Sequence, residues 1–212
     1  MFLPLFFKSG LSCLVVGGGR VASHKVRILL EASCRVTVIA PEISDYIAEK
    51  RDRRSLRWLE RGYRAGDCRG YHLVIAATPF REVNLQVSEE SRENGTPVNV
   101  VDDPVLSTVI FPAIWREKSL SVAISTGGSA PFMASEIRTR IARFARGLGD
   151  WAETAGRFRE AVKREPLTAE AKNMLYRRFV DAGPQALRDA PHEGAGLANW
   201  LAWLDEKQDR SD

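Results

Sequence analysis

The stretch LVVGGGRVA, residues 14–22, places three glycines between an apolar run and a helical pattern. Gly17, Gly19 and Ala22 follow the spacing G-x-G-x-x-A of dinucleotide-binding turns. Gly17 permits a tight turn there, and Gly19 permits close approach of the backbone to a ligand. A helix start carries unpaired N–H groups and partial positive charge, which suit a phosphate. A tight turn without a ligand is the alternative.

Carboxylates follow two other apolar runs. Asp102 and Asp103 follow residues 98–101, and either could act as a general base. Because Asp-Pro sequences favour turns and Pro104 comes next, a turn and a catalytic role are equal alternatives. Glu42 follows residues 35–40, near where an acidic residue often binds the ribose of a dinucleotide. No basic residue directly follows Glu42, which favours NAD over NADP.

A third candidate is STGGSAP, residues 125–131, which precedes a helical pattern. Its glycines and hydroxyls offer hydrogen-bond donors to an anion, and a hydroxyl could instead cap the helix. These two alternatives are equal. Ser125, Thr126 and Gly127 are therefore candidate substrate contacts.

The elements that must position these residues are predicted from periodicity. Apolar runs predict strands ending at residue 16 and over 35–40, 73–77 and 98–101, and the alternating pattern LRWLE predicts a strand over 56–60. Helical patterns at 21–33, 46–54 and 82–94 alternate with them, which is typical of a doubly wound parallel sheet. The carboxyl ends of such strands meet at one edge. The candidates at this edge are residues 17–21, Pro41, Glu42 and Thr78, as contacts of the cofactor, and Asn99 to Asp103, of which Asn99 is a candidate substrate contact.

The pattern changes near Thr108. Two short strands around a turn at 116–119 are followed by helices at 132–146, 151–164, 168–182 and 197–207. We predict a dinucleotide-binding domain at 1–107, a β segment at 108–130 and a helical domain at 131–212. Trp200 and Trp203 lie at helical spacing and could be core or interface residues, of which a core position is favoured.

Composition limits the class of protein. The 212 residues are 44% hydrophobic and 27% charged, as in soluble globular proteins, and no apolar run reaches the roughly 18–20 residues of a membrane span. We expect a cytoplasmic protein without a membrane partner. MFLPLFFKSG, residues 1–10, lacks a basic start and a cleavage site, so we expect a segment packed on the sheet rather than a signal peptide. Cys13, Cys34 and Cys68 have no metal-ligand spacing and the three histidines are scattered, so no metal site is predicted.

Charge is uneven along the chain. Residues 138–178 carry eleven Arg or Lys against five Asp or Glu, a net +6, whereas residues 181–212 carry three against seven, a net −4. The basic stretch could be a solvated helix surface. It could also bind a polyanion, either nucleic acid or a small molecule with many carboxylates. Arg138, at its start, is a candidate substrate contact.

Taken in order, FLPLFF, CLVVGGGRVASHKVRILLEA, VTVIAPE, LVIAAT, NVVDDP, IFPAI and ISTGGSAPFMASEIR resemble the precorrin-2 dehydrogenase family. That family comprises stand-alone enzymes and the amino-terminal module of siroheme synthase, and the likeness covers about residues 2–146. It implies an α/β fold with a Rossmann domain, a small β dimerisation region and a helical domain, assembled as an intertwined homodimer. It also implies NAD-dependent oxidation of precorrin-2 to sirohydrochlorin on the route to sirohaem. Some members insert Fe²⁺ as well, so a bifunctional ferrochelatase is an alternative.

The resemblance also assigns roles to residues. It implies catalysis at Asp102, the aspartate of NVVD, rather than at Asp103. A serine that siroheme synthase can carry phosphorylated falls on Thr126, so we do not expect that modification. Precorrin-2 has eight carboxylates, which would explain the basic stretch without nucleic acid. A non-enzymatic NAD or tetrapyrrole sensor that contacts DNA is a further alternative, but no helix-turn-helix pattern is present and the tail is acidic. The implied NAD contacts are Arg20, Val21, Pro41 and Glu42.

Overall fold

The computed structural model describes residues 10–187 and 189–208, so the segment expected to pack on the sheet lies largely outside it. Internal contacts divide the chain into two compact units. The first contains the residues up to Phe111 together with Gly127–Ser129, and the second contains Pro112–Thr126 and the residues from Ala130. The division into three functional regions, with boundaries after residues 107 and 130, stays a prediction.

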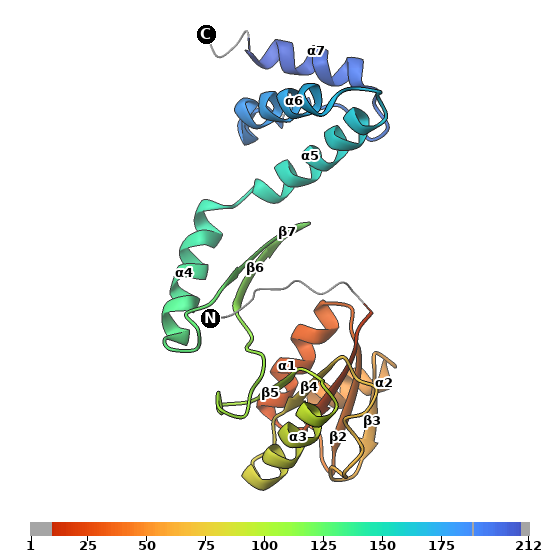
Figure 1. The fold of residues 1–212 in the computed structure, drawn as a ribbon, viewed down its shortest axis with the longest axis vertical. Coiled ribbons are helices and arrows are strands. Elements are labelled where there is room, and N and C mark those ends of the chain that lie inside the picture. Colours follow the sequence, from red (N-terminus) through yellow and green to blue (C-terminus); the bar gives the residue numbers. More distant parts are fainter. Residues whose placement is uncertain (1–9, 188, 209–212) are drawn as a thin grey trace. The chain divides into compact units, whose positions relative to one another are not determined.

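The first unit is a parallel sheet flanked by helices, which confirms the predicted Rossmann-type fold (Figure 1). The strand order is β3-β2-β1-β4-β5, and every neighbouring pair is parallel. The strands are β1 (Ser12–Val16), β2 (Arg35–Ala40), β3 (Leu56–Glu60), β4 (Leu73–Ala76) and β5 (Val98–Val100). The helices are α1 (Arg20–Glu31), α2 (Asp45–Asp52) and α3 (Arg81–Glu93).

The β-branched runs form strands because both faces of the sheet are covered. Alternate residues of β1 enter two cores. Val15 packs in the core that includes Val26 of α1 and Ile47 of α2, whereas Val16 packs in the core that includes Val87 of α3. Burial on both faces explains why the runs are continuously apolar rather than alternating.

A half-buried carboxylate fixes the loop between β3 and β4. Glu90 of α3 accepts hydrogen bonds from the Tyr63 hydroxyl and from the backbone N–H groups of Gly66 and Cys68, the last two at 2.9 Å. Burial by itself would raise the pKa of Glu90, but these hydrogen bonds outweigh it and hold the pKa below its usual range. The loop is therefore tied to α3 through one side chain.

The second unit joins a hairpin to a set of helices. β6 (Ala113–Glu117) and β7 (Leu120–Ile124) pair antiparallel. The helices are α4 (Pro131–Phe144), α5 (Leu148–Lys163), α6 (Ala169–Ala182), the 3₁₀ helix η1 (Pro184–Leu187) and α7 (Leu197–Gln208). Trp200 and Trp203 are buried in the aromatic core of this unit, with ring centroids 5.8 Å apart, which confirms the core prediction. None of the described helices has the length and apolar character needed to cross a bilayer.

One helix begins earlier than its sequence pattern predicts. The periodicity placed its start at residue 151, whereas α5 begins at Leu148. The Glu117 carboxylate of β6 accepts hydrogen bonds from the N–H groups of Gly147 and Gly149, at 3.1 and 2.8 Å. A carboxylate at a helix N-terminus satisfies donors that the helix leaves unpaired. The extra turn thus depends on a residue about thirty positions away, which periodicity cannot reveal.

Candidate functional site

The strand order locates a crevice at the carboxyl edge of the first unit. β1 lies between β2 and β4, and α1 connects β1 to β2, so the order reverses between β1 and β4. Ligands of open α/β sheets bind outside the carboxyl ends of the strands at such a switch point. The glycine turn follows β1 directly and therefore occupies this position.

The first two glycines of the turn are required by packing. Gly17 has φ +124°, which disfavours other residues, and a Cβ there would overlap the carbonyl group of Ala77, lying 2.7 Å from its carbon. A Cβ on Gly18 would overlap the carbonyl oxygen of Glu42 and lie 2.9 Å from Cβ of Ala40. These glycines let the turn fit between the ends of β4 and β2. The motif spacing predicts a role for Gly17 but gives none to Gly18.

Gly19 differs from both. It is exposed, its φ is −79°, and no atom lies within 4 Å of the position that a Cβ would take. It is the N-cap of α1, has no side-chain cap, and is followed by a first turn without an acidic residue. The first N–H groups of α1 therefore have neither a side-chain cap nor an acidic side chain in their own helical turn. This cradle fits the pyrophosphate of a dinucleotide.

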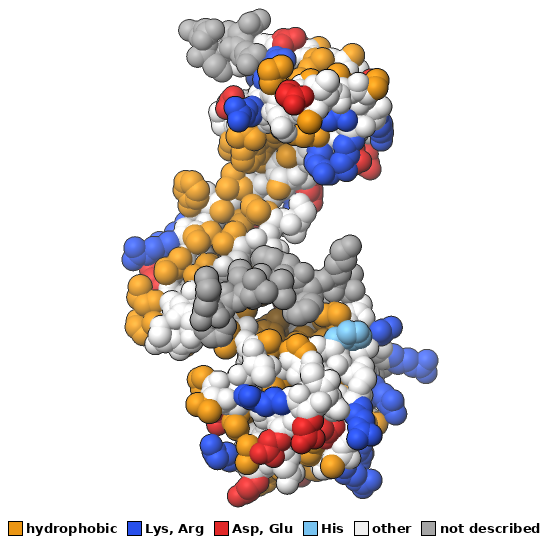
Figure 2. Space-filling view, viewed as in Figure 1, with side chains coloured by type: hydrophobic (Ala, Val, Ile, Leu, Met, Phe, Trp, Pro, Cys, Tyr) orange, Lys and Arg blue, Asp and Glu red, His pale blue; other side chains and the backbone are white. Residues whose placement is uncertain are grey.

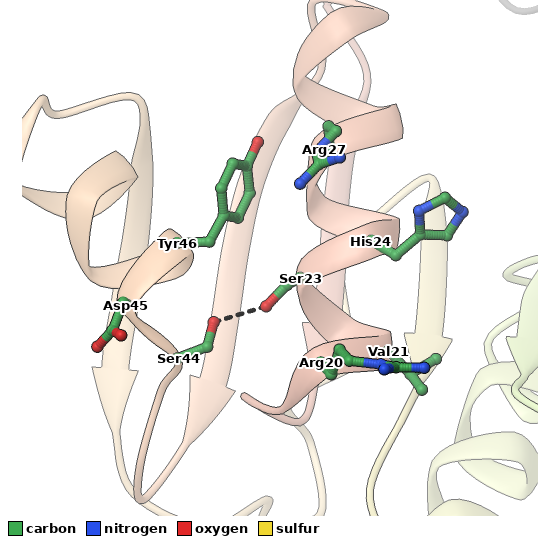
Figure 3. Close-up of a pocket in the computed structure, with 8 residues that line it drawn as sticks. All are labelled: Arg20, Val21, Ser23, His24, Arg27, Ser44, Asp45 and Tyr46. Carbon is green, nitrogen blue, oxygen red and sulfur yellow. Dashed lines mark hydrogen bonds between the residues drawn. The ribbon is translucent and has the colours of Figure 1, made fainter.

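Next to the cradle, α1 and the start of α2 enclose a pocket of about 680 Å³ (Figure 3). The Ser23 and Ser44 hydroxyl oxygens are 2.6 Å apart and join the two helices. The Arg27 guanidinium lies 5.0 Å from the ring centroid of Tyr46. The eight lining residues are Arg20, Val21, Ser23, His24, Arg27, Ser44, Asp45 and Tyr46.

Of the residues that line this pocket, only Arg20 and Val21 were predicted from the sequence. No basic residue follows Glu42 directly, and the arginines of the pocket come from α1 instead. The helical spacing of Arg20, His24 and Arg27 was the signal that could have found them. Among the other predicted residues at this edge, Pro41 and Glu42 are exposed immediately after β2.

Thr78 follows β4 but its hydroxyl is already engaged. It donates to Oδ1 of Asn84 at 2.7 Å, and the Thr78 N–H donates to the same oxygen at 3.2 Å. The side chain therefore holds the start of α3, and any contact of Thr78 with a cofactor stays a prediction.

The structure separates the two aspartates after β5. Oδ1 of Asp103 accepts a hydrogen bond from the Leu106 N–H at 3.2 Å, and Oδ2 lies 3.7 Å from the Arg81 guanidinium. Asp103 is thus the turn residue. Asp102 is exposed, has φ +59°, and no hydrogen-bond donor of the described chain reaches its carboxylate. Its charge is available to a ligand.

Asn99 lies inside β5 rather than at its end. It pairs with Ile75, whose side chain belongs to the α1 side of the sheet, so Asn99 faces that side too. Its Nδ2 donates to the Val109 carbonyl at 2.9 Å, while Oδ1 is buried without a hydrogen-bond partner among the described residues. Its predicted substrate contact is untested.

The remaining candidates lie beyond Phe111 in the chain. Ser125, Thr126 and Arg138 belong to the second unit, and Gly127 is grouped with the first. Oγ1 of Thr126 accepts a hydrogen bond from the Ala130 N–H at 3.0 Å, which is the capping alternative of the sequence analysis. Arg138 is exposed on α4. Their contact with a substrate stays a prediction.

The sequence analysis did not single out Lys25 of α1. Its Nζ lies 4.1 Å from the ring centroid of Phe111. Burial lowers the pKa of Lys25, and the negative charge of Asp102 opposes this lowering. Within the part of the chain that the structure describes, no three His, Cys, Asp or Glu side chains could together hold a metal ion.

Comparisons with known proteins agree with this geometry. Residues 6–113 match the family described as "Putative NAD(P)-binding", and residues 117–143 match "Sirohaem biosynthesis protein central". A siroheme synthase of Methylococcus capsulatus is 41% identical over 187 residues, covering 87% of this chain and 39% of that protein. A siroheme synthase of Pseudomonas putida is 44% identical over 196 residues, covering 92% of this chain and 42% of that protein. The chain thus spans less than half the length of these two relatives.

Among solved structures, "SirC, precorrin-2 dehydrogenase" superimposes with a TM-score of 0.76 at 22% identity, covering 99% of this chain and 100% of that one. This match supports the fold of the whole chain. The family match, which covers residues 6–113, confirms the predicted nicotinamide dinucleotide cofactor. The chain therefore belongs to the family described as "Putative NAD(P)-binding", and over most of its length it is similar to siroheme synthases.

Proposed function

We propose that this chain oxidises precorrin-2 to sirohydrochlorin with NAD⁺, in the cytoplasm. The observation that carries the proposal is the free carboxylate of Asp102 at the same sheet edge as the Gly19 cradle. The similarity to siroheme synthases supports the substrate, which is a tetrapyrrole with eight carboxylates. The three cysteines are free thiols, as expected in a reducing compartment.

The reaction removes a hydride and a proton from the macrocycle. NAD⁺, when bound, supplies the acceptor for the hydride. The N-terminus of α1 and Gly19 hold the pyrophosphate, and the arginines of the adjoining pocket offset its charge. The Asp102 carboxylate accepts the proton, and a positioned base contributes about 10²–10⁴-fold to such a step. The macrocycle would thereby lose two electrons, with its proton held at Asp102 and its hydride passed to the bound cofactor.

The proposal includes a homodimer formed by the second unit. β6 and β7 form a sheet of only two strands among the described residues, which leaves the outer edge of each strand without a strand partner. Phe132, Met133 and Phe144 of α4 are 73%, 42% and 86% exposed. Figure 2 shows hydrophobic side chains gathered along α4. A second copy would cover both features, because exposed apolar patches and open edges mark association surfaces.

The first test is anaerobic incubation of the purified protein with enzymatically generated precorrin-2. The absorbance of sirohydrochlorin is followed with and without NAD⁺, and Fe²⁺ is added afterwards. Oxidation that requires both NAD⁺ and the protein supports the proposal. Oxidation no faster than in the protein-free control refutes it. Protein-dependent conversion to sirohaem after Fe²⁺ addition would reveal the second activity that some members of the family have.

The base is tested by Asp102→Asn, with Asp103→Asn as the matched control. Asparagine tolerates the left-handed backbone as well as aspartate does, so the variant removes charge without adding strain. We expect kcat to fall about 10²–10⁴-fold for Asp102→Asn. Asp103→Asn should lose some thermal stability but keep its turnover per folded molecule. Equal turnover of both variants would exclude Asp102 as the base.

A further inference from the structure

Lys25 is a half-buried cation without an anionic partner in contact. No carboxylate of the described residues lies within 4.0 Å of its Nζ, and the neighbour that covers it is the ring of Phe111, 4.1 Å from Nζ to the centroid. A partly desolvated ammonium loses hydration that a ring only partly replaces. Such a group is poised for an anion that arrives from outside the chain.

The position of Lys25 identifies where that anion would lie. Lys25 is on α1, whose buried residues Ala22, Val26 and Leu29 pack on one side of the sheet. Phe111 packs against that same core. The charged group of the chain that acts on Lys25 is Asp102, after β5, whose attraction opposes the effect of burial on the pKa of Lys25. The segment that contains Phe111 contributes a ring rather than a charge.

A second polar group on this side of the sheet also lacks a partner. Oδ1 of Asn99 is buried without a hydrogen bond from the described chain, and Asn99 is only 8% exposed. Oδ1 of Asn99 only accepts hydrogen bonds, so a ligand would have to supply an N–H or O–H donor to it, whereas the Lys25 ammonium requires an anion. Buried polar groups without partners are few in folded proteins, and bound ligands are one explanation for them.

We propose that Lys25 binds a carboxylate of the tetrapyrrole beside Asp102, and so fixes the macrocycle in position for proton transfer. This inference rests on the proposed function, because the ligand is the substrate proposed there. The substrate carries eight carboxylates. A carboxylate that comes near Asp102 is repelled by the charge of that residue unless a cation lies beside it. An ammonium next to that carboxylate gives the anion a place to bind. The glycine cradle that is proposed to bind the cofactor is formed by other residues. A change at Lys25 should therefore affect substrate binding and leave cofactor binding unaltered.

The variants are Lys25→Met, which keeps the length without the charge, and Lys25→Arg, which keeps the charge. Two bindings are measured on each by absorbance or fluorescence titration: the stable product sirohydrochlorin, and NAD⁺. We expect Lys25→Met to weaken sirohydrochlorin binding and raise KM for precorrin-2 about tenfold or more, with NAD⁺ affinity unchanged. Lys25→Arg should restore most of the affinity. A thermal melt of each variant separates these effects from loss of folding.

The pH dependence gives a readout that a packing role would not move. Because burial lowers the pKa of Lys25, the wild-type protein should lose affinity for sirohydrochlorin as pH rises into the alkaline range. Lys25→Arg should retain its affinity there, since a guanidinium stays charged. Lys25→Met should show no such alkaline loss at all.

The outcomes distinguish this inference from the function on which it rests. A wild-type protein that neither oxidises precorrin-2 nor binds sirohydrochlorin would overturn the proposed function. A wild-type protein that does both, together with a Lys25→Met variant that binds sirohydrochlorin equally well, would overturn only the role of Lys25. Weakened NAD⁺ binding with unchanged sirohydrochlorin binding would also overturn it, and would assign Lys25 to the cofactor.

Discussion

Substitution of Gly19 by alanine should weaken NAD⁺ binding without unfolding the protein. Gly19 has an ordinary φ of −79°, and a methyl group there would meet no atom of the described chain within 4 Å. The methyl would instead occupy space where the pyrophosphate approaches the N-terminus of α1. Hydrogen bonds to a charged group contribute about 1.5–3 kcal/mol each. Loss of one such bond corresponds to about a ten- to hundredfold weaker Kd.

Gly18→Ala is the matched control, one residue away. Its methyl would overlap the Glu42 carbonyl oxygen and lie 2.9 Å from Cβ of Ala40. Overpacking of this kind costs about 1–3 kcal/mol, because backbone must move. In a chain of this size each kcal/mol lowers Tm by about 2–4 °C. Gly19→Ala should change stability by less than about 1 kcal/mol, the usual cost of replacing glycine at an N-cap.

The assay combines a thermal melt with calorimetric titration of NAD⁺ into each variant at a temperature where both are folded. The expected pattern is a wild-type Tm with weak binding for Gly19→Ala, and a lowered Tm for Gly18→Ala. If Gly19→Ala binds NAD⁺ as tightly as the wild type, the cradle is not the pyrophosphate site. If Gly18→Ala melts like the wild type, the close approach of the glycine turn to β2 is not what requires glycine.

Three further predictions follow from side chains outside the cradle. Glu90→Gln should cost about 1–3 kcal/mol at neutral pH, since three donors lose a charged acceptor. Because the pKa of Glu90 is depressed in the folded protein, its contribution to the free energy of unfolding is present above about pH 4.3 and is lost as pH falls through the folded pKa. Denaturant unfolding measured from pH 7 to 3 should therefore show that the stability of the variant is less sensitive to acid than that of the wild type. Glu117→Gln should shorten α5 at its start and lower Tm by a few degrees, about 1 kcal/mol, whereas an unchanged Tm would mean that the cap is not stabilising. Phe144→Asp should convert the proposed dimer to monomer, and light scattering that gives the wild-type mass for this variant would place the contact elsewhere.

The fold was predictable because its elements have strong local signals. Four of the five parallel strands are apolar runs and β3 alternates, whereas the helices between them have one apolar stripe, so the periodicities of the two kinds of element differ clearly. Glycine-rich and Asp-Pro turns separate them. A predicted helix boundary was wrong where a residue distant in sequence determines the end of the helix. This is the case at α5, whose first turn depends on Glu117.

The glycines of the turn show which structural requirements a sequence motif predicts and which it does not. The spacing G-x-G-x-x-A names Gly17 and Gly19, and the structure gives each the role that the motif implies: a strained turn for one and an open cap for the other. Gly18 has no place in the motif, yet the end of β2 passes so close that only glycine fits. The requirement comes from the neighbouring strand and is therefore invisible in the local sequence.

For Asp102 and Asp103 the local sequence predicts less, because the two residues have the same type and adjacent positions. What separates them is the backbone after β5, which turns Asp103 towards Leu106 and Arg81 and leaves Asp102 in a left-handed conformation with its carboxylate free. A non-glycine residue in that conformation costs energy, and such residues concentrate at functional sites. The charge that acts on Lys25 then comes from this same aspartate, although the two residues lie in distant parts of the chain. A site assembled in this way is recognisable only once the sheet has brought β5 and α1 together.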